Sequence, residues 1–446
     1  MNILDIIAKK RDGNVLDKNE IYFFINNYVS GKITDYQASA MLMAMYIRGL
    51  SMEETTNLTL AMAYSANVLD FSGVFKNDYI LDKHSTGGVG DKVTIIVVPI
   101  AAALGVKIFK MSGRGLGFTG GTADKLESIE GYKVDQDLVN AMRIVNNCGA
   151  CMVTQNEDLA IADKKLYGLR DVTATITSIP LIAASVMSKK IACGVNKIVL
   201  EVTVGDGAFM KTEEEAIELA KVMVRIGKDA GKEVIAIITN MDEPLGTKVG
   251  NSLEIEEVIE FLTADNEELS SPKWYDLKSV VYEVVAYMMK LSGKGELIRE
   301  NKRLIEQAIL DRTAYKKFLE IVEAQGGSIE VKRPLLKSGV AFKKEIKATE
   351  EGYVNYIRTD MLGQALVELG GGRHTKDEEI DLSVGFILDK KNGEKVYKGD
   401  IILEVYFNDK DKFENAAEYI TQAIKIEKEK IEKKDHILGI ITEDDL

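Results

Sequence analysis

The sequence predicts an α/β fold with three parts: a helical N-terminal domain, a large mostly parallel α/β domain and a C-terminal α+β module. Residues 1–66 carry apolar positions at three- and four-residue spacing, which is typical of amphipathic helices. From about residue 79, short β-rich runs alternate with helical stretches, as in parallel sheets with crossover helices. Residues 340–446 change again, to strands separated by polar turns.

Individual elements follow from the same patterns. In the first part, Ser51 and Glu54 have the spacing of a capping box for the helix expected over 51–65. Residues 158–195 interrupt the α/β alternation with two more helices, which we expect to pack on the N-terminal bundle. The expected domains are a helical domain of 1–66 and 158–195, an α/β domain of 70–157 and 196–335, and a C-terminal module of 340–446.

Composition limits the partners. The 446 residues include 57 lysines and arginines against 70 aspartates and glutamates, a formal charge of −13, so we expect no nucleic acid partner. The first residues lack an apolar signal core, and no stretch reaches the ~20 apolar residues of a membrane span. We therefore expect a cytoplasmic protein without a membrane partner. Three cysteines, Cys148, Cys151 and Cys193, are too few for a disulfide framework.

A glycine-rich loop over 83–91, Lys-His-Ser-Thr-Gly-Gly-Val-Gly-Asp, lies between a predicted strand and a predicted helix. Glycines let the backbone approach an anion, and the N–H groups and dipole of the helix start favour negative charge. Lys83 adds a positive charge, while Ser85 and Thr94 supply hydroxyl donors. The loop matches neither a P-loop nor a dinucleotide-binding motif.

A second glycine-rich loop, over 110–124, has the same setting between a strand and a helix. Adjacent parallel strands bring such loops to one edge of the sheet, so we expect Lys110, Ser112 and Thr122 to face the anion from the other side. Two lysines and four hydroxyls around one pocket suit inorganic phosphate.

These loops resemble a known family. The stretch 112–127 is similar to the signature of the thymidine and pyrimidine-nucleoside phosphorylases, and 83–91 matches their phosphate loop. The resemblance continues through 167–175, 185–190, 207–210 and 370–373, and so covers nearly the whole chain. It implies that phosphate cleaves pyrimidine nucleosides such as uridine or thymidine to the free base and (deoxy)ribose 1-phosphate. It assigns phosphate binding to Lys83, Ser85, Thr94, Lys110, Ser112 and Thr122, and pyrimidine binding to Tyr167, Arg170, Ser185 and Lys189.

Residues 178–194 have the local features that this assignment requires. Ser178 is expected to cap a helix, with Pro180 in its first turn. Ser185 and Lys189 are then one turn apart on one face of that helix.

The resemblance gives catalytic roles to His84, Arg170 and Lys189. As the C1′–N1 bond breaks, Arg170 and Lys189 would stabilise the charge on the departing pyrimidine, and His84 would protonate a ring oxygen. Neither a redox cofactor nor a covalent intermediate is required. Because phosphate and pyrimidine are held by different domains, we expect domain closure by a hinge motion.

The sequence departs from the family at three places. Phe118 stands where members usually carry histidine, so no role is transferred to that side chain. Lys110 resembles the broad-specificity enzymes, whereas strict thymidine phosphorylases tend to have methionine there, and this favours acceptance of both uridine and thymidine. Some members bind potassium, at positions matching Gly90, Lys92, Leu245, Lys248 and Glu257. Here positions 92 and 248 carry lysine instead of small residues, and an ammonium group near Glu257 is the alternative to the ion.

Other interpretations stay open: a thymidine phosphorylase with strict deoxyribose preference, an anthranilate-type phosphoribosyltransferase, or a non-catalytic binding module that keeps the fold. A phosphoribosyltransferase of that type requires acidic residues that bind magnesium-pyrophosphate. Residues 392–400 resemble the turn of biotinyl or lipoyl carrier domains, but the nearby lysines, Lys390 and Lys391, follow aspartate rather than methionine. We therefore expect a structural module. The resemblance to the family, together with apolar faces on the N-terminal helices, implies a homodimer.

Overall fold

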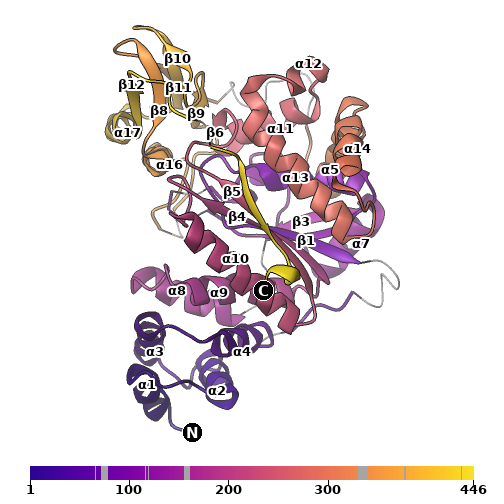
Figure 1. The fold of residues 1–446 in the computed structure, drawn as a ribbon, viewed down its shortest axis with the longest axis vertical. Helices are drawn as coiled ribbons and strands as arrows, with labels where there is room; N and C mark the ends of the chain where they lie inside the picture. The colour runs from indigo at the N-terminus through magenta and orange to yellow at the C-terminus, as the bar shows by residue number, and fades with distance from the viewer. Residues whose placement is uncertain are drawn as a thin grey trace.

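A six-stranded sheet, in the order β13-β5-β4-β1-β2-β3, forms the centre of the molecule (Figure 1). This computed structural model describes residues 1–65, 67–71, 79–115, 117–118, 120–154, 161–329, 339–375, 378–432 and 434–446. The first five strands in the chain are parallel, and the last is antiparallel to β5. Their bounds are β1 Ile80–Ser85, β2 Lys107–Ser112, β3 Ala150–Thr154, β4 Lys197–Val204, β5 Glu233–Asn240 and β13 Ile437–Ile441.

Helices cover both faces of the sheet, which is why its central strands have no solvated side. All eight residues of β4 are buried, with Val199 in one apolar core and Ile198 in the other. Side chains alternate between the faces because successive Cβ atoms of a strand point in opposite directions. One core includes α5 (Val93–Ala103), α13 (Tyr275–Leu291), α14 (Ile298–Leu310) and α15 (Thr313–Ala324), and the other α7 (Leu138–Cys148), α9 (Ile179–Ala192) and α10 (Glu213–Asp229).

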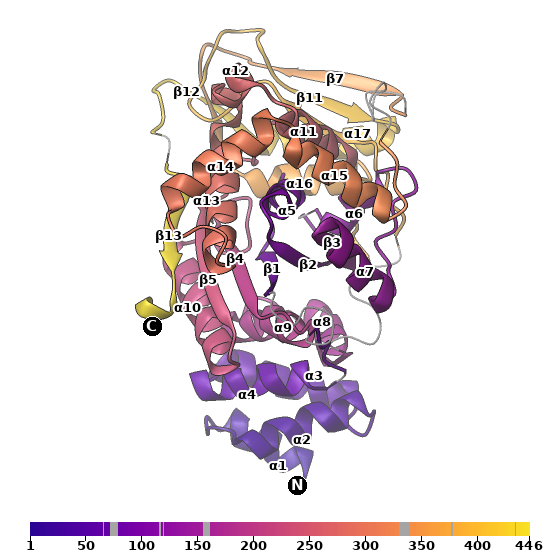
Figure 2. The ribbon, with the colours of Figure 1, turned by 90° about the vertical axis from the view of Figure 1, so that its right-hand side faces the viewer.

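The N-terminal helices form a bundle at one end of the molecule, and α8 and α9 lie between this bundle and the sheet (Figures 1 and 2). The bundle consists of α1 (Ile3–Arg11), α2 (Lys18–Val29), α3 (Asp35–Arg48) and α4 (Met52–Ala63), on which α8 (Ile161–Val172) and α9 pack. The predicted capping box is present: Ser51 Oγ accepts from Glu54 N at 3.1 Å, and Glu54 Oε2 accepts from Ser51 N at 2.8 Å.

The C-terminal part contains two small sheets, ordered β10-β8-β12 and β6-β9-β11-β7. Its elements are β7 Phe342–Lys347, β8 Gly352–Tyr356, α16 Thr359–Glu368, β9 Gly385–Leu388, β10 Lys395–Val396, β11 Ile401–Phe407, α17 Lys410–Ala423 and β12 Ile424–Glu427. Strand β6 (Lys248–Val249) comes from the α/β domain and pairs with β9, so strand pairing joins the two parts. The end of the chain then returns to the central sheet as β13.

Further short elements complete the fold: α6 Thr122–Glu127, α11 Asn251–Leu262, α12 Asn266–Leu269, and the 3₁₀ turns Pro272–Trp274 and Glu443–Asp445. Across the described ranges, no helix combines the length and apolar character that crossing a membrane requires. The predicted fold class, with its helical N-terminal domain, mostly parallel α/β domain and C-terminal module, is confirmed.

Candidate active site

The two glycine-rich loops leave the carboxyl ends of β1 and β2, which are adjacent and parallel. The register pairs Ile80 with Lys107 and Leu81 with Ile108. Continued along both strands, it brings Lys83 level with Lys110, and the two lysines therefore point to the same side of the sheet. The structure thus brings the predicted phosphate-binding lysines together at one edge.

Lys83 is completely buried, and its charge is balanced by a carboxylate from the next strand. Its Nζ donates to Thr94 Oγ1 at 3.0 Å and to Glu201 on β4. Burial raises the pKa of Glu201 to about 7, against the opposing effect of Lys83. Sequence analysis did not identify Glu201, although an acidic residue within the apolar run of a predicted buried strand could have indicated it.

Asp91 fixes the first loop from its far end. Its Oδ2 accepts from Ser85 Oγ at 2.6 Å, and its Oδ1 accepts from Val93 N at 3.2 Å in the first turn of α5. Lys125 donates to the backbone oxygen of Asp91 at 2.6 Å. Ser85 Oγ also accepts from Gly87 N at 3.1 Å, so one hydroxyl, one carboxylate and one lysine hold the turn in shape.

The second loop offers polar groups that are less completely paired. Lys110 Nζ donates to the Met111 carbonyl at 2.8 Å, and Ser112 Oγ, which is buried, has no hydrogen-bond partner within the described part of the chain. Burial, followed by the charge of Lys190, lowers the pKa of Lys110 to about 7. Thr122 is the first residue of α6, whose helix start lies over the same loop. An anion would satisfy both Lys110 and Ser112.

His84 lies among four lysines. Burial and then the charges of Lys190, Lys110, Lys189 and Lys83 lower its pKa well below the ordinary value. The imidazole is therefore neutral at pH 7 in this arrangement. A bound dianion would oppose the charge of these lysines and raise the pKa of His84.

Helix α9 is joined to the sheet by a buried ion pair. Lys190 Nζ donates to Asp82 Oδ2 at 2.6 Å and to the Met111 carbonyl at 3.0 Å. It therefore contacts β1 and β2 together, directly below the two loops. This pair positions the helix that carries Ser185 and Lys189.

Ser185 and Lys189 lie on one face of α9, as the spacing predicts. Lys189 Nζ is 3.3 Å from Ser185 Oγ and 2.7 Å from Asp163 Oδ2 on α8. The other oxygen of Asp163 is buried and has no hydrogen-bond partner among the described residues. Asp163 is a second site residue that sequence analysis missed, because its contact with Lys189 spans two helices.

The guanidinium of Arg170 forms hydrogen bonds mainly with nearby backbone carbonyls. Its guanidinium donates to the carbonyls of Thr175 at 3.2 Å, Ile176 at 2.7 Å and Leu181 at 3.0 Å. These bonds take three of its five N–H groups and leave two for a ligand. Arg170 thus shapes the turn between α8 and α9. Tyr167, one turn earlier on α8, is half-buried, and burial raises the pKa of its hydroxyl.

The C-terminal part closes over the second loop. Arg373 donates to Asp124 Oδ1 at 2.8 Å, and its carbonyl accepts from Gly117 N at 3.1 Å. Phe118 packs its ring against Phe209, with centroids 5.4 Å apart. The residue that replaces the usual histidine of the family therefore contributes an apolar contact.

The residues expected to hold potassium do not fit a potassium ion, because an ammonium group fills the position. Lys92 Nζ donates to the Leu245 carbonyl at 2.5 Å and forms an ion pair of 2.9 Å with Glu257. Gly90 approaches the same carbonyl: a Cβ added there would lie 2.8 Å from it. The Lys248 ammonium instead pairs with Glu256 and Glu260.

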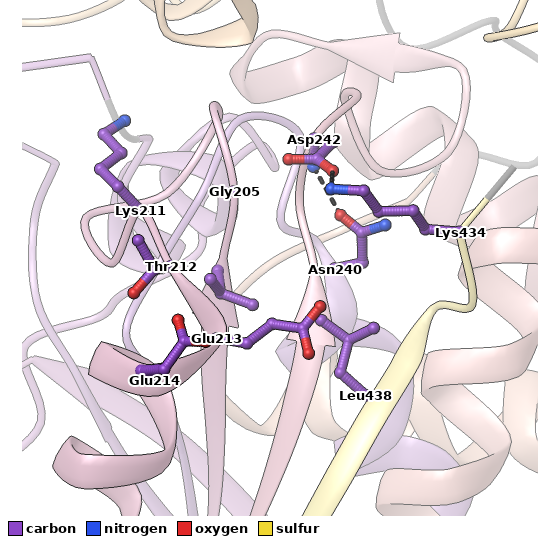
Figure 3. A pocket seen from close by; sticks show the side chains of 10 residues that line it. Gly205, Lys211, Thr212, Glu213, Glu214, Asn240, Asp242, Lys434 and Leu438 are labelled. Atoms are coloured by element: carbon purple, nitrogen blue, oxygen red, sulfur yellow. Dashed lines mark hydrogen bonds and ion pairs between the residues drawn. The ribbon is translucent and has the colours of Figure 1, made fainter. Parts of the chain in front are cut away.

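A cavity of about 350 Å³ opens at the carboxyl ends of β4 and β5 (Figure 3). It contains both signs of charge, including an ion pair of 2.7 Å between Lys434 and Asp242. None of the predicted phosphate or pyrimidine residues lines it. The loops and helix described above are therefore the better candidate for the active site.

Comparison with known proteins places all three parts of the chain. The glycosyl transferase family α/β domain matches residues 77–315, and the helical bundle domain of the same family matches residues 4–66. The pyrimidine nucleoside phosphorylase C-terminal domain matches residues 353–427. Fold and site thus define a glycosyl transferase built from a helical bundle and an α/β domain.

Two curated relatives indicate which family within this class the chain belongs to. A pyrimidine-nucleoside phosphorylase of Staphylococcus haemolyticus (strain JCSC1435) is 44% identical over 428 residues, covering 96% of each chain. One of Staphylococcus aureus (strain MSSA476) is 45% identical over 412 residues, covering 92% of this chain and 93% of the relative. The chain belongs to the pyrimidine-nucleoside phosphorylase family.

A more distant solved structure shares the fold alone. Anthranilate phosphoribosyltransferase from Thermus thermophilus superimposes with a TM-score of 0.56 at 18% sequence identity, covering 72% of this chain and 99% of that one.

The Lys83–Glu201 pair gives a first prediction. Glu201→Gln should lower the free energy of unfolding by about 2–4 kcal/mol without phosphate, because it leaves a buried lysine without its counter-charge. Phosphate should then raise the melting temperature of the variant more than that of the wild type. In the variant the anion supplies the missing partner of Lys83, and the negative charge of Glu201 no longer repels it. Thermal unfolding with and without phosphate measures both effects.

Glu233→Gln is the matched control, because Glu233 is more than half exposed and pairs with Lys197 at the start of the neighbouring strand. It should change stability by less than about 0.5 kcal/mol. Equal phosphate responses in Glu201→Gln and wild type would contradict the role given to Glu201.

Proposed function

We propose that this protein catalyses phosphorolysis of pyrimidine nucleosides, as a pentosyltransferase that needs no organic cofactor. Uridine, thymidine or deoxyuridine would react with inorganic phosphate to give the free base and α-D-ribose or deoxyribose 1-phosphate. One observation carries the proposal: the β1 and β2 loops, with Lys83 and Lys110, meet α9, with Ser185 and Lys189, around His84. Family membership supports the same reaction.

The reaction needs an anionic nucleophile and a stabilised leaving group. A phosphate oxygen attacks C1′ as the C1′–N1 bond breaks, the electrons of that bond pass to the pyrimidine, and the anomeric carbon is inverted. Lys83, Lys110 and the nearby hydroxyls hold the phosphate. Its negative charge also stabilises the cationic character that develops on the sugar.

Protonation of the base depends on phosphate being present. Burial and then the surrounding lysines lower the pKa of His84 and so keep its imidazole neutral before phosphate binds. Bound phosphate raises the pKa of His84, so that the ring can donate a proton to a carbonyl oxygen of the departing base. Lys189, held by Asp163, stabilises the same developing charge, and the two remaining N–H groups of Arg170 can bind a pyrimidine carbonyl.

Two features favour a broad phosphorylase over the alternatives. The carboxylates nearest the first loop are already engaged, Asp91 by Ser85 and Glu201 by Lys83, which suits a compact phosphate site better than magnesium-pyrophosphate. Lys110 adds a second cation where strict thymidine phosphorylases tend to carry methionine. We therefore propose that both uridine and thymidine are substrates.

We further propose a homodimer formed through the N-terminal helices, in a cytoplasmic enzyme. Large apolar side chains are exposed on α1, α3 and α8, among them Leu4 (60%), Tyr36 (75%), Ile47 (67%) and Val172 (78%). Helices α1 and α8 both pack against α3, so these side chains belong to neighbouring helices. Sedimentation equilibrium should give twice the mass of one chain, and a monomer at micromolar concentration would contradict the proposal.

The reaction itself is tested by phosphate-dependent release of uracil from uridine. Lys189→Ala should lower kcat/KM by roughly tenfold to a thousandfold, the usual cost of one donor to a developing anion. Lys165→Ala is the control, because Lys165 is exposed on α8 and donates to the Val29 carbonyl, away from the site. Unchanged activity in Lys189→Ala would remove Lys189 from the site, and no phosphate-dependent release by the wild type would overturn the function.

The pKa of Lys110, about 7, predicts a pH effect on phosphate binding. Above that pH the free enzyme loses the Lys110 proton, and with it a positive charge, so KM for phosphate should rise as pH increases from about 7 to about 9. Lys110→Met should raise KM at neutral pH and flatten this dependence. Lys107→Met, at the outer end of the same strand, should keep the wild-type profile. The assignment fails if Lys110→Met keeps the wild-type profile as well.

A further inference from the structure

The loop between β5 and β6 is held by two buried lysine ammonium groups. Lys391 Nζ donates to the carbonyls of Pro244 at 2.5 Å and Gly246 at 2.8 Å. Lys92 Nζ donates to the carbonyl between them, that of Leu245, at 2.5 Å. Three successive carbonyls are thus directed at positive charge, the kind of oxygen set that replaces the hydration shell of a monovalent cation.

Each ammonium group is paired with a buried carboxylate, and Lys391 has a second acidic partner, Glu243, at 3.8 Å. Lys92 pairs with Glu257 at 2.9 Å and Lys391 with Asp276 at 2.8 Å, and all four side chains are less than a tenth exposed. Asp276 also accepts from Gly246 N at 2.9 Å. The two ammonium groups therefore supply the positive charge that the buried carboxylates Glu257 and Asp276 require.

The buried negative charge of Glu257 requires a cation at this position. It accepts from the backbone N–H and the hydroxyl of Thr247 at 2.8 and 2.7 Å, from Lys248 N at 2.9 Å and from Trp274 Nε1 at 2.9 Å. Burial opposes ionisation, but the charge of Lys92 and these hydrogen bonds outweigh it and lower the pKa of Glu257 to about 2. A permanently ionised, buried carboxylate requires a fixed positive partner.

The cluster supports the phosphate loop directly. Leu245 N donates to the Val89 carbonyl at 3.2 Å, and Gly90 has a φ of +78° with the Leu245 carbonyl against its Cα. Lys92 itself follows the loop and precedes α5. Lys391 belongs to the C-terminal part, which β6 and β9 also join to this loop. The two lysines therefore connect the phosphate loop, the β5–β6 loop and the C-terminal part.

We infer that Lys92 and Lys391 are positioning residues that replace a bound monovalent cation, so that this chain keeps its phosphate loop in place without potassium. Lys92 occupies the position that the family resemblance gives to the ion, and Lys391 holds the two flanking carbonyls. The inference concerns the folded protein and does not rest on the proposed reaction, because cation dependence is read from thermal unfolding.

The wild-type protein is tested first. Its melting temperature should be the same in equal concentrations of potassium, sodium and choline chloride. A rise specific to potassium in the wild type would overturn the inference, whatever the variants do.

Lys92→Thr removes the ammonium group and leaves the Leu245 carbonyl and Glu257 free to bind an ion. In choline chloride its melting temperature should fall by roughly 5–10 °C, as expected for one partner removed from a buried pair in a large chain. Potassium should restore at least half of this loss, and sodium less. Where phosphorolysis is measured, KM for phosphate should follow the same order of cations.

Two variants control for general effects of salt and of substitution. Lys92→Met fills the same space without charge, so it should be destabilised and not restored by potassium. Lys248→Thr makes the same substitution at a lysine of β6 whose ammonium group pairs with Glu256 and Glu260 outside the cluster, so it should gain no potassium dependence. Restoration of Lys92→Met, or no restoration of folded Lys92→Thr, would contradict the inference.

Discussion

Buried positive charge, paired residue by residue with carboxylates, is the interaction on which the architecture of the site depends. At and around the carboxyl ends of β1 and β2, Lys83 pairs with Glu201, Lys190 with Asp82, Lys92 with Glu257, Lys125 with Glu254 and Lys391 with Asp276. Lys110 differs, because its only hydrogen bond within the described residues is to a backbone carbonyl. An acidic protein thereby concentrates unbalanced positive charge at one point, where we propose that an anion binds.

The same pairs explain how separate elements are held in position. Strand β4 supplies the acid for Lys83, α9 supplies the lysine for Asp82, and the C-terminal part supplies Lys391. The residues that we propose to bind phosphate and those that we propose to bind pyrimidine are therefore connected through the sheet. Losing one partner of a buried pair is costly, since the other charge is left in a medium of low polarity. The position of each loop is thus determined by charge as well as by packing.

The sequence predicted the local part of this arrangement. Glycine-rich loops after strands indicated the anion site, and the one-turn spacing of Ser185 and Lys189 indicated their common face. It did not predict Glu201, Asp163 or the carbonyl contacts of Arg170, because these depend on which strands and helices become neighbours. The pairing of β13 with β5 is likewise a contact between distant parts of the chain. For Lys92, the family resemblance had already indicated Leu245 and Glu257 as neighbours, but the second ammonium group, that of Lys391, was found only in the folded chain.

A structure of the protein with phosphate bound would test the central claim most directly. The account predicts the anion between the β1 and β2 loops, within hydrogen-bonding distance of Lys110 Nζ and Ser112 Oγ. An anion bound elsewhere, for example beside Lys211 and Lys434 in the cavity at the ends of β4 and β5, would contradict it.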